Sequence, residues 1–288
     1  MTKLLLEAKH GIKYIKDFDG ILIGLKNFSV GYEVEMDIEE LKELKENNPD
    51  KELFVVFNKN IMNEELEEVT TLLKELEKLN IEGVLFYDLA VLHIKQKQNL
   101  NLNLVWNQTH MVTNYNTCNY YYNEGCKYAY LSQEITLEEM LEIIDKSNIK
   151  TLIKVFGHSV MAHSKRKLLS NYFKHINKEK EKDVYNISET HLKKEYVVKE
   201  DNIGTTIFDG ALVNGIRPTF SLVDKADYLI LEEQDEGFEK VIEIYQKALK
   251  NEISEEAAVS ILEELYPDST EGFFYTKTIY RVKKNEES

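Results

Sequence analysis

Eight short apolar runs recur along the chain, and helix-like stretches separate most of them. The runs lie at residues 4–6, 20–25, 53–57, 84–87, 102–106, 128–131, 151–156 and 228–231. Alternation of strands and helices implies parallel strands that are joined by right-handed crossovers. Eight such units in about 250 residues match the size and strand count of a TIM-like barrel. We therefore predict an α/β fold, a TIM-like (β/α)8 barrel.

The stretches between these runs carry signals for the beginning of a helix. Asp37 and Asn63 each precede a segment with helical spacing, and the acids in the first turn after Asn63 favour the helix dipole. Thr136 followed by Glu139 forms a capping-box pattern. Caps and periodicity therefore agree on where the helices of the barrel begin.

The regular alternation stops after Phe156, and roughly 70 residues separate this run from the next one at 228. Loops in α/β units usually have about 2 to 6 residues, so we predict an insertion at 157–222, between the seventh and eighth strands. Within it, 195–199 and 205–208 flank a turn and are expected to form a hairpin. We treat 1–288 as a single barrel domain. Its C-terminal extension, 267–288, would form a final strand or return across the barrel mouth.

Composition restricts the partners of the protein. The formal net charge of -15 opposes association with phosphate backbones and membrane surfaces, unless a local patch overrides it. The apolar run before Glu7 has only three leucines, which is too short to cross a bilayer. We expect no membrane association and a cytoplasmic location.

The two cysteines, Cys118 and Cys126, are expected to lie in one helix, eight positions apart. This spacing corresponds to about 12 Å along the helix axis. A disulfide requires Cα atoms within about 7 Å, so the two should not pair. Two thiols also do not suffice for an ordinary iron–sulfur cluster or a cysteine-rich zinc site. We predict buried, unreactive thiols and no metal site.

The segment 155–173, VFGHSVMAHSKRKLLSNYF, is the only basic, histidine-bearing stretch in this acidic chain. It follows a predicted strand, and α/β barrels place their chemistry just past the C-terminal ends of strands. The segment is therefore the first candidate for a site. Solvated surface explains such a basic run equally well.

Polar residues also follow the other predicted strands, where they would converge on one mouth of the barrel. They are Glu7, Asn58, Asp88, Asn107, Gln108, Ser132, His158, Glu232 and Glu233. The alternative explanation for these polar residues is that every strand must leave the barrel through something polar, whether or not a site lies there. The chain lacks the nucleophile elbow, the zinc-binding histidine pair, the phosphate-binding loop and the dinucleotide fingerprint. Hydrolases and nucleotide-binding proteins are therefore disfavoured.

At 155–173 the chain resembles the collagenase-like peptidase family of unassigned catalytic type, whose hallmark ends in Asn-Tyr-Phe. Four other stretches are similar to the same family: WNQTHMVTNYNTCNYYYNEG (106–125), IGTTIFDG (203–210), YLILEEQDEGFEKVIEIYQKAL (228–249) and the closing GFFY (272–275). The form of the hallmark, Ser-Lys-Arg-x-Leu-Leu-Ser-Asn-Tyr-Phe, resembles the short, cysteine-poor branch of low-GC bacteria.

The chain departs from the family where relatives hold an iron–sulfur cluster with four cysteines. Met161, Ala162 and Lys167 stand where hallmark cysteines are expected, and no downstream pair of cysteines exists. In the last strand, the chain keeps one acid of the family pattern, Glu232, and loses both basic residues. We therefore expect no cofactor to be bound by this chain.

The resemblance implies a subunit of a system that forms 5-hydroxyuridine at the tRNA wobble position, with prephenate as a small-molecule ligand and a larger cysteine-containing paralogue as partner. A collagenase-like peptidase and a non-catalytic scaffold for the paralogue are the alternatives. Catalytic residues are not assigned. The basic residues would meet tRNA phosphate or an anion, and the histidines and amides would line the mouth. The candidates for substrate binding are Asn107, Gln108, Asn114, His158, His163, Lys165, Arg166, Asn171 and Glu232.

Overall fold

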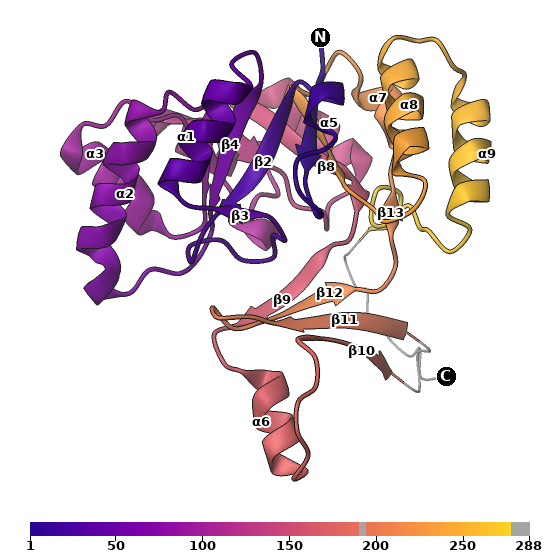
Figure 1. Cartoon of the computed structure of the whole chain (residues 1–288). Coiled ribbons are helices and arrows are strands. Elements are labelled where there is room, and N and C mark those ends of the chain that lie inside the picture. Colours follow the sequence, from indigo (N-terminus) through magenta and orange to yellow (C-terminus); the bar gives the residue numbers. More distant parts are fainter. Residues whose placement is uncertain (190–193, 278–288) are drawn as a thin grey trace, which may run out of the picture.

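The computed structural model describes residues 1–189 and 194–277, and it confirms the predicted TIM-like barrel (Figure 1). The barrel strands are β1 (Lys3–Glu7), β2 (Gly20–Leu25), β4 (Glu52–Phe57), β5 (Gly83–Phe86), β6 (Leu104–Trp106), β7 (Cys126–Tyr130), β8 (Lys150–Gly157) and β14 (Tyr228–Glu232). Each pairs in parallel with the next one, and β14 pairs with β1, which closes the barrel. The short β3 (Glu35–Met36) pairs with the end of β2.

Helices surround the barrel and bury apolar residues in one continuous core, with the last of them packed on the two helices before it. They are α1 (Ile38–Asn47), α2 (Leu66–Lys78), α3 (Leu89–Gln98), α4 (Tyr115–Asn123), α5 (Leu137–Lys146), α7 (Ile216–Leu222), α8 (Phe238–Leu249) and α9 (Glu255–Leu265). Between β1 and β2 the described chain forms only a 3-10 turn, Ile15–Asp17.

Two of the three predicted helix caps are confirmed. The Asp37 side chain accepts a hydrogen bond from the Glu40 backbone N–H at 3.0 Å, and Thr136 forms the capping box with Glu139. The prediction for Asn63 is wrong, because this residue begins a 3-10 turn, Asn63–Glu65, and α2 starts only after it.

The prediction that both cysteines lie in one helix is also wrong. Cys118 lies in α4, whereas Cys126 opens β7. Between them, Gly125 has a φ of +96°, a left-handed conformation that ends helices and favours glycine. Both thiols are free and buried.

Apolar side chains fill the interior of the barrel toward the N-terminal ends of the strands. The rings of Phe54, Tyr128 and Tyr228 meet edge to face, with centroids 5.2 to 5.8 Å apart. Aromatic rings prefer this arrangement, which places the positive edge of one ring against the negative face of another. Leu5, Leu152 and Ile230 add to the same buried cluster. The interior is therefore a packed core and not a channel.

The chain leaves the barrel after Gly157 and builds a second sheet before it returns. This sheet contains β9 (Val160–Ser164), β10 (Val184–Glu189), β11 (Lys194–Glu200) and β12 (Thr205–Asp209), in the antiparallel order β10-β11-β12-β9. β11 and β12 contain the residues in which the sequence predicts a hairpin. Figure 1 shows the sheet beyond the barrel and α6 (Leu168–His175) on its far side.

Two connections hold the barrel mouth and its surroundings together. The short β13 (Val213–Asn214) pairs antiparallel with the end of β8 and leads into α7. After α9, the chain returns to the mouth, where the N–H of Asn214 donates to the carbonyl of Thr270 at 2.7 Å. The N–H of Leu137 donates to the carbonyl of Phe274 at 2.9 Å. Residues 278–288 of the predicted extension lie outside the described residues.

Across residues 1–189 and 194–277, no helix has both the length and the apolar character needed to traverse a bilayer.

Candidate functional site at the barrel mouth

A layer of charged residues lies above the apolar core of the barrel. Side chains alternate along a strand, so a residue two positions after an inward-pointing one also points inward. Leu5, Leu152 and Ile230 belong to the interior cluster, and the residues two positions further on are Glu7, Lys154 and Glu232. Glu7 and Glu232 are register partners on the paired strands β1 and β14. Period and register together therefore bring two carboxylates and one ammonium group into one layer.

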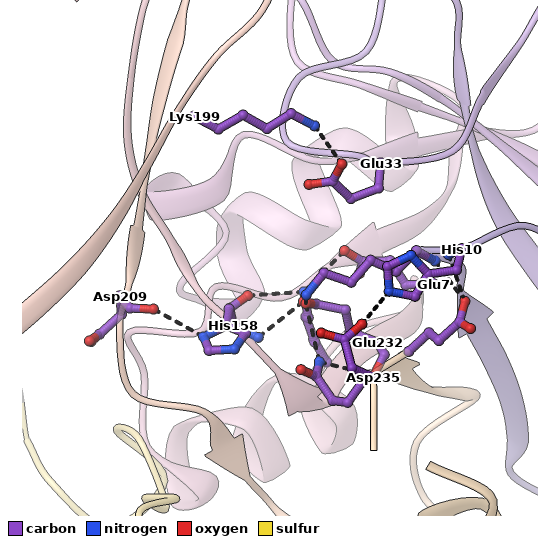
Figure 2. Close-up of polar contacts among 12 residues, drawn as sticks. Glu7, His10, Glu33, His158, Lys199, Asp209, Glu232 and Asp235 are labelled. Carbon is purple, nitrogen blue, oxygen red and sulfur yellow. Dashed lines mark hydrogen bonds and ion pairs between the residues drawn. The ribbon is translucent and has the colours of Figure 1, made fainter. Parts of the chain in front are cut away.

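Lys154 holds the two carboxylates together. Its Nζ donates to Oε1 of Glu7 at 3.1 Å, to Oε2 of Glu232 and to the carbonyl of His158 at 3.0 Å. An ammonium group has three donors, so these contacts use all of them. Glu232 also accepts a bond from the N–H of His158 at 3.0 Å. Figure 2 shows Glu7, Glu232 and His158 meeting at the mouth.

The two carboxylates differ in their protonation. Burial raises the pKa of Glu7 from 4.5 to about 7, because the nearby ammonium of Lys154 offsets only part of the desolvation. Burial acts on Glu232 in the same direction, but Lys154 and Lys9 outweigh it and lower its pKa. For Lys154, burial is outweighed by the two carboxylates, which raise its pKa. Glu7 is thus the group in this layer that exchanges a proton near neutral pH.

Two tyrosines and one glycine pack around this layer. Tyr32 and Tyr130 lie beside Glu7, and burial raises their pKa values well above the ordinary value of 10.0. Gly157, with a φ of +135°, packs directly on the charged layer. A Cβ at this position would lie 2.5 Å from Cβ of Glu232, so only glycine fits.

A cavity of about 490 Å³ opens above the charged layer, a volume typical of sites for small molecules. The strand ends and their loops form its floor, including Glu7, Asn107 and Lys154. Residues of the insertion form one wall, and 270–274 contribute another. Its aromatic lining residues are Tyr32, Tyr87, Tyr130, Phe273 and Phe274.

Three of the predicted site residues line this cavity: Asn107, His158 and His163. Nδ1 of His158 lies 3.1 Å from the backbone carbonyl of Asp209, so this nitrogen carries the proton. Nδ1 of His163 lies 3.0 Å from Oγ1 of Thr206, and burial lowers the pKa of His163. Glu232 lies next to the floor, where Lys154 holds it.

Gln108 and Asn114 have contacts within the barrel wall and are not among the residues that line the cavity. The side-chain amide of Gln108 accepts from Nε1 of Trp106 at 3.0 Å and donates to the carbonyl of Tyr87 at 2.8 Å. The side chain of Asn114 caps α4 through the N–H of Thr117.

The basic candidates lie outside the cavity, on the surface of the insertion. Lys165, Arg166 and Asn171 are all exposed. Nζ of Lys165 donates to the backbone carbonyl of Asn60, which lines the cavity. Asn171 lies on α6, on the far side of the inserted sheet. The basic segment therefore begins at the rim of the cavity and leads away from it.

Sequence reasoning missed Lys154, Tyr32 and Tyr130. A signal for Lys154 exists, because it is the one charged residue between Thr151 and Gly157 in an otherwise apolar strand. A buried lysine requires a carboxylate partner, and the predicted strand ends offer several. The two tyrosines carry no such signal.

The residues of this chain do not fit the iron–sulfur cluster that the sequence resemblance associates with cysteine-rich members of the family. Cys118 and Cys126 lie on separate elements, and burial raises the pKa of each thiol to about 12. Thiolates are the ligands of such clusters, and these thiols stay protonated. In the described part of the chain, no group of three or more His, Cys, Asp or Glu residues is arranged to hold a metal ion.

Fold and site together define a TIM-like barrel protein with a ligand-sized cavity at its C-terminal mouth. The model of Peptidase family U32 matches residues 7–285, and the chain belongs to this family. A curated relative, the tRNA hydroxylation protein P2 of Bacillus subtilis (strain 168), is 26% identical over 251 residues, which cover 79% of this chain and 81% of the relative. The solved structure of the U32 peptidase Mk0906 has a similar fold, with a TM-score of 0.52 and 13% identity over 82% of this chain and 94% of that one.

Proposed function

We propose that this protein is a subunit of a cytoplasmic system that hydroxylates tRNA at the wobble uridine, forming 5-hydroxyuridine in a prephenate-dependent reaction. The observation that carries the proposal is the similarity to the tRNA hydroxylation protein P2, which extends over most of both chains. The partner would be a larger, cysteine-containing paralogue.

The distribution of charge supports a contact with tRNA. Residues 165–183 contain seven lysine or arginine residues and three acidic ones, in a chain with a net charge of -15. Charges interact over a Debye length of about 8 Å at physiological salt, so such a segment attracts phosphate locally. Because Lys165 lies at the cavity rim and α6 lies beyond it, a tRNA could contact the insertion while one of its bases enters the cavity.

The available side chains support a division of labour with a paralogue. Redox chemistry on a metal cluster needs ligands that this chain does not offer, as its two thiols are buried and protonated. The cavity and the basic insertion are suited to binding and positioning a substrate. In this proposal, the paralogue supplies the redox group.

Deletion of the gene tests the proposal. Mass spectrometry of nucleosides from total tRNA should show loss of 5-hydroxyuridine and its derivatives, and a plasmid-borne copy should restore them. Normal levels in the deletion strain, with known parallel pathways also removed, would refute the proposal.

Variants of the restoring copy separate a substrate-binding subunit from a scaffold. Replacement of His163, Lys165 and Arg166 by alanine should lower the modification while the paralogue still co-purifies. Full modification with the triple variant would show that the chain only supports its partner.

The family name favours peptidase activity as a second candidate. In the described residues, however, the His158 ring bonds to a backbone carbonyl and not to the neighbouring hydroxyl of Ser159. Incubation of the purified protein with gelatin and unstructured peptides tests this candidate. Cleavage that disappears when His158, Ser159 and His163 are replaced would establish it.

A further inference from the structure

One face of α6 is fixed on the inserted sheet. Leu169 is buried, and the ring of Phe173 packs on the ring of Tyr185 with 5.0 Å between centroids. The backbone N–H of Ser170 donates to Oε2 of Glu200 at 3.1 Å, and its hydroxyl donates to Oε1 of the same buried carboxylate. These contacts tie the helix to β11 and fix the direction of its opposite face.

The opposite face of α6 presents an exposed aromatic ring. Leu168, Tyr172 and His175 are four and three positions apart, a spacing that places them on one side of a helix, and all three are exposed. Tyr172 is 57% exposed, although its ring lies edge to face with that of Phe173, with centroids 5.6 Å apart. The ring is therefore held by its neighbour, while more than half of the residue faces solvent.

Cations without carboxylate partners precede and follow this tyrosine. Of the seven lysine and arginine residues in 165–183, only Lys180 forms an ion pair with a carboxylate of the described chain, through Asp183 and Glu200. The other six are Lys165, Arg166, Lys167, Lys174, Lys178 and Lys182, and all six are exposed. In a chain with a net charge of -15, this surface carries positive charge that its own acids leave largely unneutralised.

We propose that Tyr172 is a stacking platform for an unpaired base of an RNA strand, and that the surrounding cations hold the phosphates on either side of this base. An exposed aromatic ring among cations is the combination with which proteins bind single-stranded nucleic acid. A duplex would offer only its phosphates, because its base faces are already stacked. A protein partner fits less well, because lysine is depleted from protein–protein interfaces.

This contact lies apart from the cavity, since Figure 1 shows α6 on the side of the inserted sheet that faces away from the barrel. A base on Tyr172 is therefore a different nucleotide from any that enters the barrel mouth. The inference rests on the proposed function only in taking tRNA as the natural RNA. It adds a second point of contact, at which a base and not only the phosphates is bound.

A tryptophan at position 172 reports stacking directly. The native Trp106 is fully buried, so the fluorescence of the wild type serves as the background for Tyr172→Trp. Titration of the full-length variant with an oligouridylate of about 12 nucleotides should quench the added fluorescence saturably. Duplex RNA of the same length, at the same salt concentration, should quench it much less. The wild type should show no comparable change with either RNA.

Binding of the same oligonucleotide separates the ring from the charges. Tyr172→Ala should weaken binding by at least about fivefold, since the loss of one stacked base has this effect or a larger one. The dependence of binding on salt should keep its slope, because no charge is removed. Tyr172→Phe keeps the ring and should bind like the wild type. The matched control is Tyr120→Ala, which removes a tyrosine that is 59% exposed on α4 and should leave binding unchanged.

Three results would overturn the inference: no quenching by the single strand, equal quenching by the duplex, or unchanged binding by Tyr172→Ala. Loss of the co-purifying paralogue from Tyr172→Ala, with RNA binding intact, would show instead that this face binds a protein. Failure here is distinguishable from failure of the proposed function. Loss of tRNA modification in the deletion strain without quenching would remove the stacking site and leave the function. Quenching and weakened binding by Tyr172→Ala, with normal modification in the deletion strain, would do the opposite.

Discussion

Replacement of Glu7 by glutamine should stabilise the protein above pH 7 and have little effect in acid. The folded protein holds a proton on Glu7 up to about pH 7, whereas the unfolded chain releases it near 4.5. In the wild type, the contribution of Glu7 to the free energy of unfolding is therefore fully present below pH 4.5 and is lost as the pH rises through about 7. Glutamine keeps the shape and does not titrate. Its oxygen can still accept the bond from Lys154.

The size of the effect follows from the shift in pKa. One pKa unit corresponds to about 1.4 kcal/mol, so a rise from 4.5 to about 7 corresponds to about 3 kcal/mol. Most of this difference should develop between pH 5 and 8. The other titrating groups near Glu7, which are Lys154, Glu232, Lys9 and the two tyrosines, are present in both proteins and largely cancel in the comparison.

Urea denaturation at several pH values measures the difference. The single tryptophan, Trp106, is fully buried, so its fluorescence reports unfolding. The matched control is Glu142→Gln, which removes an exposed carboxyl paired with Lys146 and should show no such trend with pH. A difference between wild type and Glu7→Gln that stays constant from pH 5 to 8 would refute the assignment of the proton to Glu7.

Three further predictions concern other parts of the molecule. Gly157→Ala should lower the stability by about 1–3 kcal/mol or more in thermal melts. Gly11 also has a positive φ, but a Cβ there would meet nothing within 4 Å, so Gly11→Ala should cost less. Equal costs would contradict the packing argument. Joint replacement of residues 165–167 by alanine should reduce the slope of log K for tRNA binding against log salt concentration by about two. The melting temperature should stay nearly unchanged. An unaltered slope would exclude these cations as phosphate contacts. Cys118 and Cys126, whose thiols are buried with a pKa of about 12, should react with Ellman's reagent only after unfolding; fast reaction in the native state would contradict their burial.

The barrel could be predicted because its strands are buried on both faces. Such strands appear as continuous apolar runs, and all eight runs correspond to barrel strands. The ends of helices were predicted less reliably, because the local backbone conformation decides where a helix begins or ends. Gly125 ends α4 before Cys126, and a 3-10 turn precedes α2 at Asn63. Neither event follows from hydrophobic spacing.

The site could be predicted only in part, because it depends on long-range contacts. The strand-end rule found Glu7, Asn107, His158 and Glu232 at the mouth. It did not find Lys154, which lies inside an apolar run and is held by carboxylates from β1 and β14. The rule also ranked Gln108 together with Asn107. In the structure, Asn107 lines the cavity, whereas the side chain of Gln108 bonds to Trp106 and Tyr87 in the barrel wall.

The wall formed by 270–274 means that one side of the cavity is built from a segment outside the barrel strands, although Phe274 is also part of the buried core. In the part of the chain that the structure describes, every barrel strand and outer helix precedes residue 266, yet Phe273 and Phe274 line the cavity. Changes in this short return segment can therefore reshape the entrance while the scaffold keeps its hydrogen-bonded strands. A return segment of this kind lets the preference for a ligand change while every barrel strand stays the same.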